Sequence, residues 1–458
     1  MENAKKAYLF EKVSIPKALM TLSIPTVLSS LVMVLYNLAD TYFVSMLNDP
    51  IQNAAVTLAA PLLLAFNAVN NLFGVGASSL MSRALGKKDY ELVKRSSAFG
   101  FYCSLISGIL FSLLYAFAST PILTVLGTAP ENCAATAEYL KWTVGFGSAP
   151  AILNVVMAYL VRSEGSTLQA SIGTMSGCIL NIILDPLFIM PFGFGMGAAG
   201  AGLATFISNC FACLYFFMFI FIKRKNTFVC INPKKFSMSK QIAFGVCAVG
   251  IPASIQNLLN VTGMTVLNNF TADFGSDAVA AMGIAQKINM IPLYIALGIS
   301  QGIMPLIGYN YAMGNTKRMK KAIYLSEKIT IIMMSAITIV LWLFPNLFIS
   351  MFMKNDVIIS YGSKFLKGMC LCLPFLSTDF LAVGVFQACG MGKKSLIFAI
   401  LRKIVLEIPA LYILNALFPL YGLAYAQTVA EIILAMAAVA VIYKMFKDMD
   451  KNKVKITE

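Results

Sequence analysis

The sequence predicts an all-α polytopic membrane protein made of two similar halves. Of its 458 residues, 59% are hydrophobic and only 12% are charged, whereas soluble domains carry about 25% charged residues. The mean hydropathy is +0.79. Apolar segments long enough to cross a bilayer, which takes about 20 residues of helix, recur along the chain. Their length favours helices over the shorter, alternating strands of a β-barrel.

We predict twelve membrane-spanning helices, six in each half of the chain. They are centred near Val27, Leu64, Ile109, Val155, Ile179, Ala212, Val261, Leu293, Met334, Ala382, Ile404 and Ile433. The segments around Val155 and Ile179 are close neighbours in sequence, so their boundary is the hardest to place.

A duplication explains the division into six and six. Ile24-Pro25-Thr26 recurs as Ile251-Pro252-Ala253, and later landmarks pair at offsets that drift from 227 to 222 residues. These pairs are Pro150 with Pro374, Gly165 with Gly390, Pro186 with Pro409, and Ala204-Thr205 with Ala426-Gln427. The polar interval from Lys223 to Lys240 joins the copies, so we predict domains 1–228 and 229–458. Paired halves in a membrane are typical of carriers whose central cavity opens to each side in turn.

Basic residues indicate the orientation in the membrane. Most of the 35 lysines and arginines lie on alternate loops and at both termini, and such loops face the cytoplasm. We therefore expect a multi-pass protein of the plasma (cell inner) membrane with both termini cytoplasmic. The net charge of +15 follows from this topology and from attraction to anionic lipid, so we expect no nucleic-acid partner.

Motifs for enzymatic chemistry fail in their context. Gly195 to Gly200 fits a dinucleotide pattern but has no βαβ unit around it, and Cys210 and Cys213 form a C-x-x-C within an apolar helix. The chain has no histidine, which is the commonest general base. We find no P-loop and expect neither an enzyme, a cofactor nor a structural metal. Energy for any transport must then come from an ion gradient.

Acidic residues within the predicted spans are the main functional candidates, since an ionisable group there costs at least about 2.5 to 3.5 kcal/mol. Asp40 follows Asn37 by three residues, and Asp185 follows Asn181 by four, so each pair shares a helical face. Thr205 adds a polar group in the sixth span. The alternative is that Asp40 only caps its helix and Asp185 satisfies backbone at a proline kink.

Several fragments in a fixed order carry a family resemblance. They are Ser23-Ile24-Pro25, Asn37-Leu38-Ala39-Asp40, Gly86-Lys87-Lys88-Asp89, Arg162-Ser163-Glu164-Gly165, Asn181-Ile182-Ile183-Leu184-Asp185-Pro186, Gly283-Ile284-Ala285-Gln286-Lys287-Ile288 and Phe386-Gln387-Ala388-Cys389-Gly390. With them the chain resembles the multidrug and toxic compound extrusion (MATE) transporters over essentially its whole length.

The resemblance implies two pseudo-symmetric six-helix bundles around a central cavity. It also implies export of amphipathic, often cationic compounds in exchange for a coupling ion, H⁺ or Na⁺, with no cofactor. The coupling site would lie in the first bundle, at the positions Tyr36, Asn37, Asp40, Asn181, Asp185 and Thr205. If the ion is Na⁺, the resemblance places it at Asp40, Asn181 and Asp185.

Physical chemistry supports a coupling role for the two acids. Two carboxylates in a poorly solvated pocket repel each other, and a proton, Na⁺ or a cationic drug would each relieve that repulsion. If only one of these occupies the pocket at a time, ion entry drives drug exit. At the aligned positions of the second half stand Leu267 and Ile408, so the coupling chemistry is predicted to lie in the first half.

Other polar residues within the spans are candidates for substrate binding. Asp379 aligns near Asn154 through the repeat, so both could line the cavity, as could Gln286 and Lys287 in the eighth span. Asp379 is also the best coupling residue if the second half takes part. Lys287 could instead pair with Asp379 or with Glu407. For Glu407, local pairing with Arg402 or Lys403 is the favoured reading.

Two other functions remain open at this point. A flippase for lipid-linked saccharides would prefer basic cavity residues and often has more than twelve spans. A membrane enzyme is the more distant alternative. We expect a monomer whose partners are small amphipathic molecules and the lipid bilayer.

Overall fold

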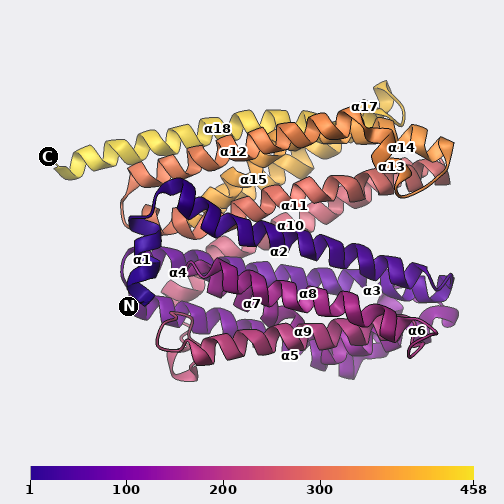
Figure 1. Cartoon of the computed structure of the whole chain (residues 1–458), viewed down its shortest axis with the longest axis horizontal. Helices are drawn as coiled ribbons and strands as arrows, with labels where there is room; N and C mark the ends of the chain where they lie inside the picture. Colours follow the sequence, from indigo (N-terminus) through magenta and orange to yellow (C-terminus); the bar gives the residue numbers. More distant parts are fainter. Residues whose placement is uncertain (1, 458) are drawn as a thin grey trace. The chain divides into compact units, whose positions relative to one another are not determined.

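The computed structural model describes residues 2–457, with side chains described for residues 6–451. All regular elements in this part of the chain are helices (Figure 1). The first are α1 (Glu2–Glu11), α2 (Ile15–Ser45), α3 (Pro50–Val69), η1 (Asn70–Val75), α4 (Gly76–Gly86), α5 (Tyr90–Val125), α6 (Pro130–Leu140), η2 (Lys141–Phe146), α7 (Ser148–Ser163), α8 (Thr167–Ile189), α9 (Ala198–Ile222) and η3 (Pro233–Lys235). They are followed by α10 (Lys240–Ala272), α11 (Ser276–Ala312), α12 (Thr316–Leu343), α13 (Pro345–Ser350), α14 (Asp356–Cys370), α15 (Leu373–Ala388), α16 (Gly392–Ile400), η4 (Leu401–Glu407), α17 (Ile408–Leu417) and α18 (Gly422–Thr457). The predicted all-α fold is confirmed.

The number of membrane spans depends on how bent helices are counted. Among the described residues, nine helices are long and apolar enough to cross a membrane, or eleven if two bent pairs each count as one span. The bent pairs are Pro130–Phe146 with Ser148–Ser163, at 51°, and Asp356–Cys370 with Leu373–Ala388, at 46°. The span predicted near Ile404 is helical through α16, η4 and α17 but carries buried charges. The count of twelve stays a prediction.

The chain divides into two compact units. The first holds the described residues up to Lys12 together with Leu28–Ser254, and the second holds Val13–Val27 together with the chain from Ile255. Helices α2 and α10 therefore each pass from one unit to the other, after Val27 and after Ser254. Each passage lies two residues beyond a proline of the repeat, Pro25 or Pro252. The predicted domain boundary at residues 228 and 229 stays a prediction.

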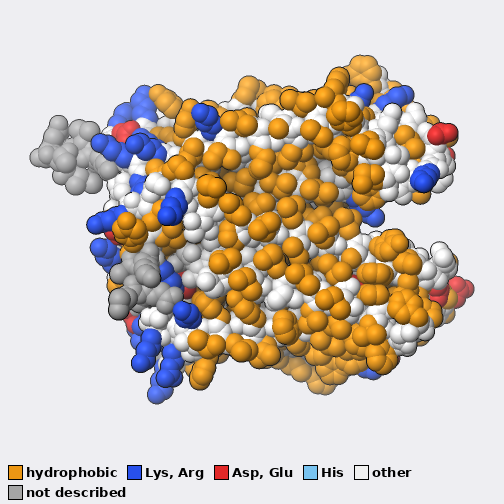
Figure 2. All heavy atoms as spheres, viewed as in Figure 1, with side chains coloured by type: hydrophobic (Ala, Val, Ile, Leu, Met, Phe, Trp, Pro, Cys, Tyr) orange, Lys and Arg blue, Asp and Glu red, His pale blue; other side chains and the backbone are white. Residues whose placement is uncertain are grey.

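The interior packing and the surface side chains of each unit are typical of a membrane protein. In the first unit, Gly108 of α5 brings the helices close: a Cβ there would lie 2.6 Å from the Cα of Ala149. Small residues at such contacts are typical of membrane bundles. The second unit has a core on α11, α14 and α15 that includes Ala285, Phe365 and Leu376. Within each unit, hydrophobic side chains cover most of the visible face while Lys and Arg gather mainly at one end (Figure 2), as expected for a bilayer-embedded surface.

Candidate coupling site

Three helices of the first unit bring together five of the six residues predicted for ion coupling. Helix α2 supplies Tyr36 and Asp40, α8 supplies Asn181 and Asp185, and α9 supplies Thr205. Asn181 and Asp185 are one turn apart and both are buried, with 1% and 0% of their surface exposed. Asp40 and Asp185 are near enough to interact electrostatically. The side chains therefore meet although α2 and α8 are more than a hundred residues apart in sequence.

Asn181 is the centre of the hydrogen bonds in this cluster. With its amide turned so that oxygen and nitrogen each meet a suitable partner, Asn181 donates to Asp185 Oδ2 over 2.9 Å. Its oxygen then accepts from Thr205 Oγ1 over 3.3 Å. The i to i+4 spacing of Asn181 and Asp185 produces the first contact, since both lie on the same helical face. Asn181 thus connects the acid of α8 to the hydroxyl of α9.

The α2 side of the cluster contains a polar atom with no partner. The Asp40 Oδ1 atom is buried and accepts no hydrogen bond among the described residues. Tyr36, one turn before it, interacts with the Thr205 side chain. A buried polar atom without a partner is costly unless a ligand or water satisfies it. Asp40 therefore has capacity for an additional ligand.

Tyr139 belongs to the cluster, and the sequence reasoning did not include it. This residue of α6 is 3% exposed and lies close enough to both Asp40 and Asp185 to interact with them. The sequence offers no charge or amide partner that would mark it. Only the packing of α6 on α3 and α9 brings it to the two acids.

Asn37 does not join the cluster. Its side chain is exposed, and its amide donates to the Met33 carbonyl of the same helix over 2.9 Å. Residues three apart in a helix are only about 60° apart around the axis. That difference is enough to separate Asn37 from Asp40 at the edge of the buried face.

The cluster around Asp40, Asn181 and Asp185 suits a small hard cation or a proton. It offers two carboxylates, an amide oxygen and hydroxyl groups, and oxygen atoms of these kinds are the ligands that hard cations prefer. A proton could bind either carboxylate instead, because the environment is poorly solvated and the neighbouring acid has the same charge. The site therefore has the chemistry needed for ion coupling.

Asn154, a candidate for substrate binding in the first unit, lies buried between α7 and α9. Its amide nitrogen donates to Asn209 Oδ1 over 3.0 Å and to the carbonyls of Pro150 and Ala151. The Asn209 contact joins α7 to α9 inside the first unit.

Lys287 is not paired with Asp379 or Glu407 in the structure, and its predicted place in the cavity wall stays a prediction. Lys287 is exposed, while Asp379 and Glu407 face Arg402 and Lys403 instead. The neighbouring Gln286 donates to Asn268 Oδ1 over 3.1 Å.

A second buried polar cluster lies within the second unit, on α15, η4 and α18. Arg402 Nε lies 2.6 Å from Glu431 Oε1, and Arg402 Nη1 lies 3.7 Å from Asp379 Oδ2. Lys403 Nζ lies 2.7 Å from both carboxylate oxygens of Glu407. The expected local pairing of Glu407 is thus present. Lys403 and Glu407 belong to the π-helical segment η4, and such segments are frequent at functional sites.

The sequence reasoning missed two acids of the second unit. Glu431 is fully buried, and Glu327 accepts a hydrogen bond from the Thr378 hydroxyl. Glu431 lies two residues from the predicted centre of the last span at Ile433. This position could have marked Glu431 as a candidate in the sequence, since acidic residues near the centre of a membrane span are rare.

The fold and the repeat agree with known transporters. A sequence profile of the MatE family matches residues 25–187 and 252–413, and the two matches begin at Pro25 and Pro252 of the repeat. The chain is 34% identical over 456 residues, 99% of both chains, to the multidrug export protein MepA of Staphylococcus saprophyticus. It is 35% identical to MepA of Staphylococcus aureus over 445 residues, 96% of both chains. The chain belongs to the MATE family.

A solved structure places this MATE protein among transporters of known fold. It matches an outward-facing multidrug resistance MATE family transporter of the MOP superfamily with a TM-score of 0.91 and 28% identity. The match covers 98% of this chain and 99% of the other. The resemblance stated from the sequence motifs is therefore confirmed.

Proposed function

We propose that this MATE protein is a secondary active multidrug exporter. It exchanges H⁺ or Na⁺ for amphipathic, often cationic compounds by alternating access, as a monomer in the plasma membrane with both termini cytoplasmic. The observation that carries the proposal is the bridge formed by Asn181 between Asp185 and Thr205, beside the unpartnered oxygen of Asp40. Relatives named multidrug export protein, which align over almost the whole chain, support the substrate class.

Competition for the two carboxylates explains how exchange would work. An empty site holds two acids in a poorly solvated pocket, and this repulsion favours binding of any positive charge. When H⁺ or Na⁺ enters, the negative charge that attracts a cationic drug is reduced, so the drug is held less tightly and leaves. The first helix carries Pro25, where the missing backbone hydrogen bond permits bending. Bending there would close the site after ion entry.

A flippase for lipid-linked saccharides is the second candidate. Its substrate carries a diphosphate, which needs basic residues such as arginine. The candidate site of the first unit holds acids and neutral polar groups, which favours a cationic substrate instead. A membrane enzyme is the more distant alternative, since the chain lacks histidine.

Purified protein in liposomes separates these functions. We expect efflux of a cationic dye under a pH gradient or under a Na⁺ gradient, and the effective gradient identifies the ion. Asp40→Asn and Asp185→Asn proteins, shown to be folded and inserted, should lose most of that efflux. Undiminished efflux in both variants would refute the coupling role. No dye movement by the wild type under either gradient would favour the flippase.

A further inference from the structure

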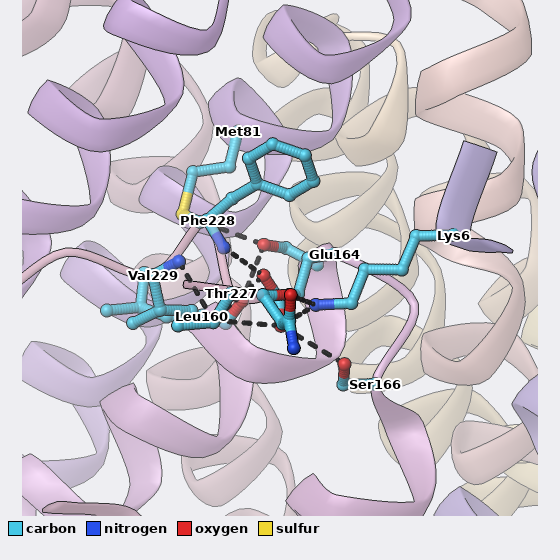
Figure 3. Close-up of polar contacts among 10 residues, drawn as sticks. Lys6, Met81, Leu160, Glu164, Ser166, Thr227, Phe228 and Val229 are labelled. Atoms are coloured by element: carbon cyan, nitrogen blue, oxygen red, sulfur yellow. Dashed lines mark hydrogen bonds and ion pairs between the residues drawn. The ribbon is translucent and has the colours of Figure 1, made fainter. Parts of the chain in front are cut away.

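A single buried carboxylate connects three separate segments of the first unit. Glu164, at the junction of α7 and α8, is 0% exposed. Lys6 Nζ of α1 lies 2.6 Å from its Oε1, and Ser166 Oγ donates to the same oxygen over 3.1 Å. From the linker between α9 and α10, Thr227 Oγ1 lies 3.0 Å from both oxygens, and the Phe228 backbone N–H donates to Oε2 over 2.6 Å (Figure 3). Both oxygens are therefore fully used.

Lys6 binds the linker as well as the acid. Its ammonium also donates to the Asn226 carbonyl over 2.9 Å and lies 5.8 Å from the centre of the Phe228 ring. Phe228 in turn stacks on Tyr90 of α5, with ring centres 5.2 Å apart. Since Lys6 contacts both Glu164 and the linker, undocking of α1 would loosen both contacts together.

Gly165 shapes the place where α1 packs. Its φ of +88° is unfavourable for a residue with a side chain. A Cβ at this position would also lie 2.9 Å from Cζ of Phe10, a buried residue of α1. The close approach of α1 to the α7–α8 junction thus requires glycine after Glu164.

The two segments held by Glu164 lead into the two helices that pass between the units. After α1 the chain enters the second unit at Val13. It stays there through the first part of α2 and returns to the first unit after Val27. The linker leads into α10, which enters the second unit after Ser254. One carboxylate therefore anchors both α1, just before the chain enters the second unit at Val13, and the linker that leads into α10.

We propose that Lys6, Glu164, Thr227 and Phe228 form a latch that docks α1 and the linker on the first unit, and that this latch opens during the transport cycle. Glu164 holds α1 through Lys6 and the linker through Thr227 and Phe228. A half-open latch would leave a buried carboxylate poorly paired, so docked and undocked forms are two discrete states. The proposal rests on the export function above, because it is that cycle which the latch biases.

The test compares Lys6→Gln with the matched control Lys12→Gln. Both changes remove one positive charge, but Lys12 is exposed just beyond the end of α1 and has no ion pair among the described contacts. Amide hydrogen exchange of residues 2–11 and 226–229 is measured in each protein. Export from liposomes gives the maximal rate and KM. Glu164→Gln and the Lys6→Gln/Glu164→Gln double variant complete a cycle.

The proposal predicts that Lys6→Gln speeds exchange in both segments at once, whereas Lys12→Gln leaves both unchanged. It further predicts a change in the maximal export rate of at least about fivefold in either direction, at an unchanged KM. The double variant should show no more than the larger single effect. Faster exchange in α1 alone, or loosened segments with unaltered export, would overturn it. If the wild-type protein moved no dye, the proposed export would fail, and the exchange data would still decide whether Glu164 ties the two segments.

Discussion

Arg402 Nε lies 2.6 Å from Glu431 Oε1, and both side chains are buried inside the second unit. The guanidinium also lies over the Phe380 ring, 4.8 Å from its centre, and faces Asp379. Arginine suits this position because its planar group stacks and bonds at the same time. The predicted span around Ile404 contains Arg402, Lys403 and Glu407, which form buried ion pairs inside the second unit. These charged residues make the span less apolar.

Replacing Arg402 should destabilise the protein strongly. Arg402→Met leaves the buried carboxylate of Glu431 without its cation, and loss of one partner of a buried pair costs about 3 to 5 kcal/mol. Thermal unfolding in detergent should show a clearly lower Tm. Arg95→Gln is the control, since its pair with Glu91 is exposed and screened by water and salt. Equal Tm values for the two variants would contradict the role of Arg402.

Gly263 of α10 makes room for the Lys403–Glu407 pair. A Cβ there would lie 3.0 Å from Lys403 Cδ and 3.3 Å from Glu407 Oε1. We expect Gly263→Ala to displace the pair and destabilise the fold by about 1 to 3 kcal/mol, as overpacking does. Gly283→Ala, where nothing lies within 4 Å of the added Cβ, should be neutral or slightly stabilising. Denaturation of both variants in the same detergent provides the comparison, and a harmless Gly263→Ala would show that the pair is not confined.

Removing Asn181 should uncouple export more than removing Asn37. Asn181→Ala breaks the connection between Asp185 and Thr205, and we expect ion-driven dye efflux to fall about tenfold or more, a loss of roughly 1.4 kcal/mol or more. Asn37→Ala removes the same amide from an exposed position on α2, so efflux should stay near the wild-type rate. Efflux from liposomes under the effective ion gradient measures both. Equal losses would mean that the cluster boundary drawn by the structure is wrong.

The C-terminus should report a cytoplasmic location. In a bacterial host, a green fluorescent protein fused after the last residue should fluoresce, since it folds in the cytoplasm and not when exported unfolded. The same reporter inserted between α2 and α3, beside Asn48, should stay dark because that loop is predicted to face outward. The reverse pattern would invert the topology.

Much of the candidate coupling site could be predicted because its signal is local. Asn181 and Asp185 are one turn apart, so their contact depends only on the helical repeat. The same argument placed Asn37 on the face of Asp40, but the Asn37 side chain is exposed and bonds to its own helix, since helical spacing does not say where the buried face ends. Tyr139 carries no charge and reaches the acids only through packing of α6, so nothing in the sequence marked it.

The sequence by itself determined the all-helical membrane fold, the duplication and the acids of the first half. These follow from composition, period and spacing, because a bilayer excludes charge and demands long apolar helices. Only the tertiary structure decided which residues pair with the buried charges. It also decided that α2 and α10 are each divided between the two units. Glu164 meets Lys6 across 158 residues of sequence and Thr227 across 63, and Arg402 meets Glu431 across 29. Such contacts depend on which helices pack together, and helix packing is a property of the whole chain.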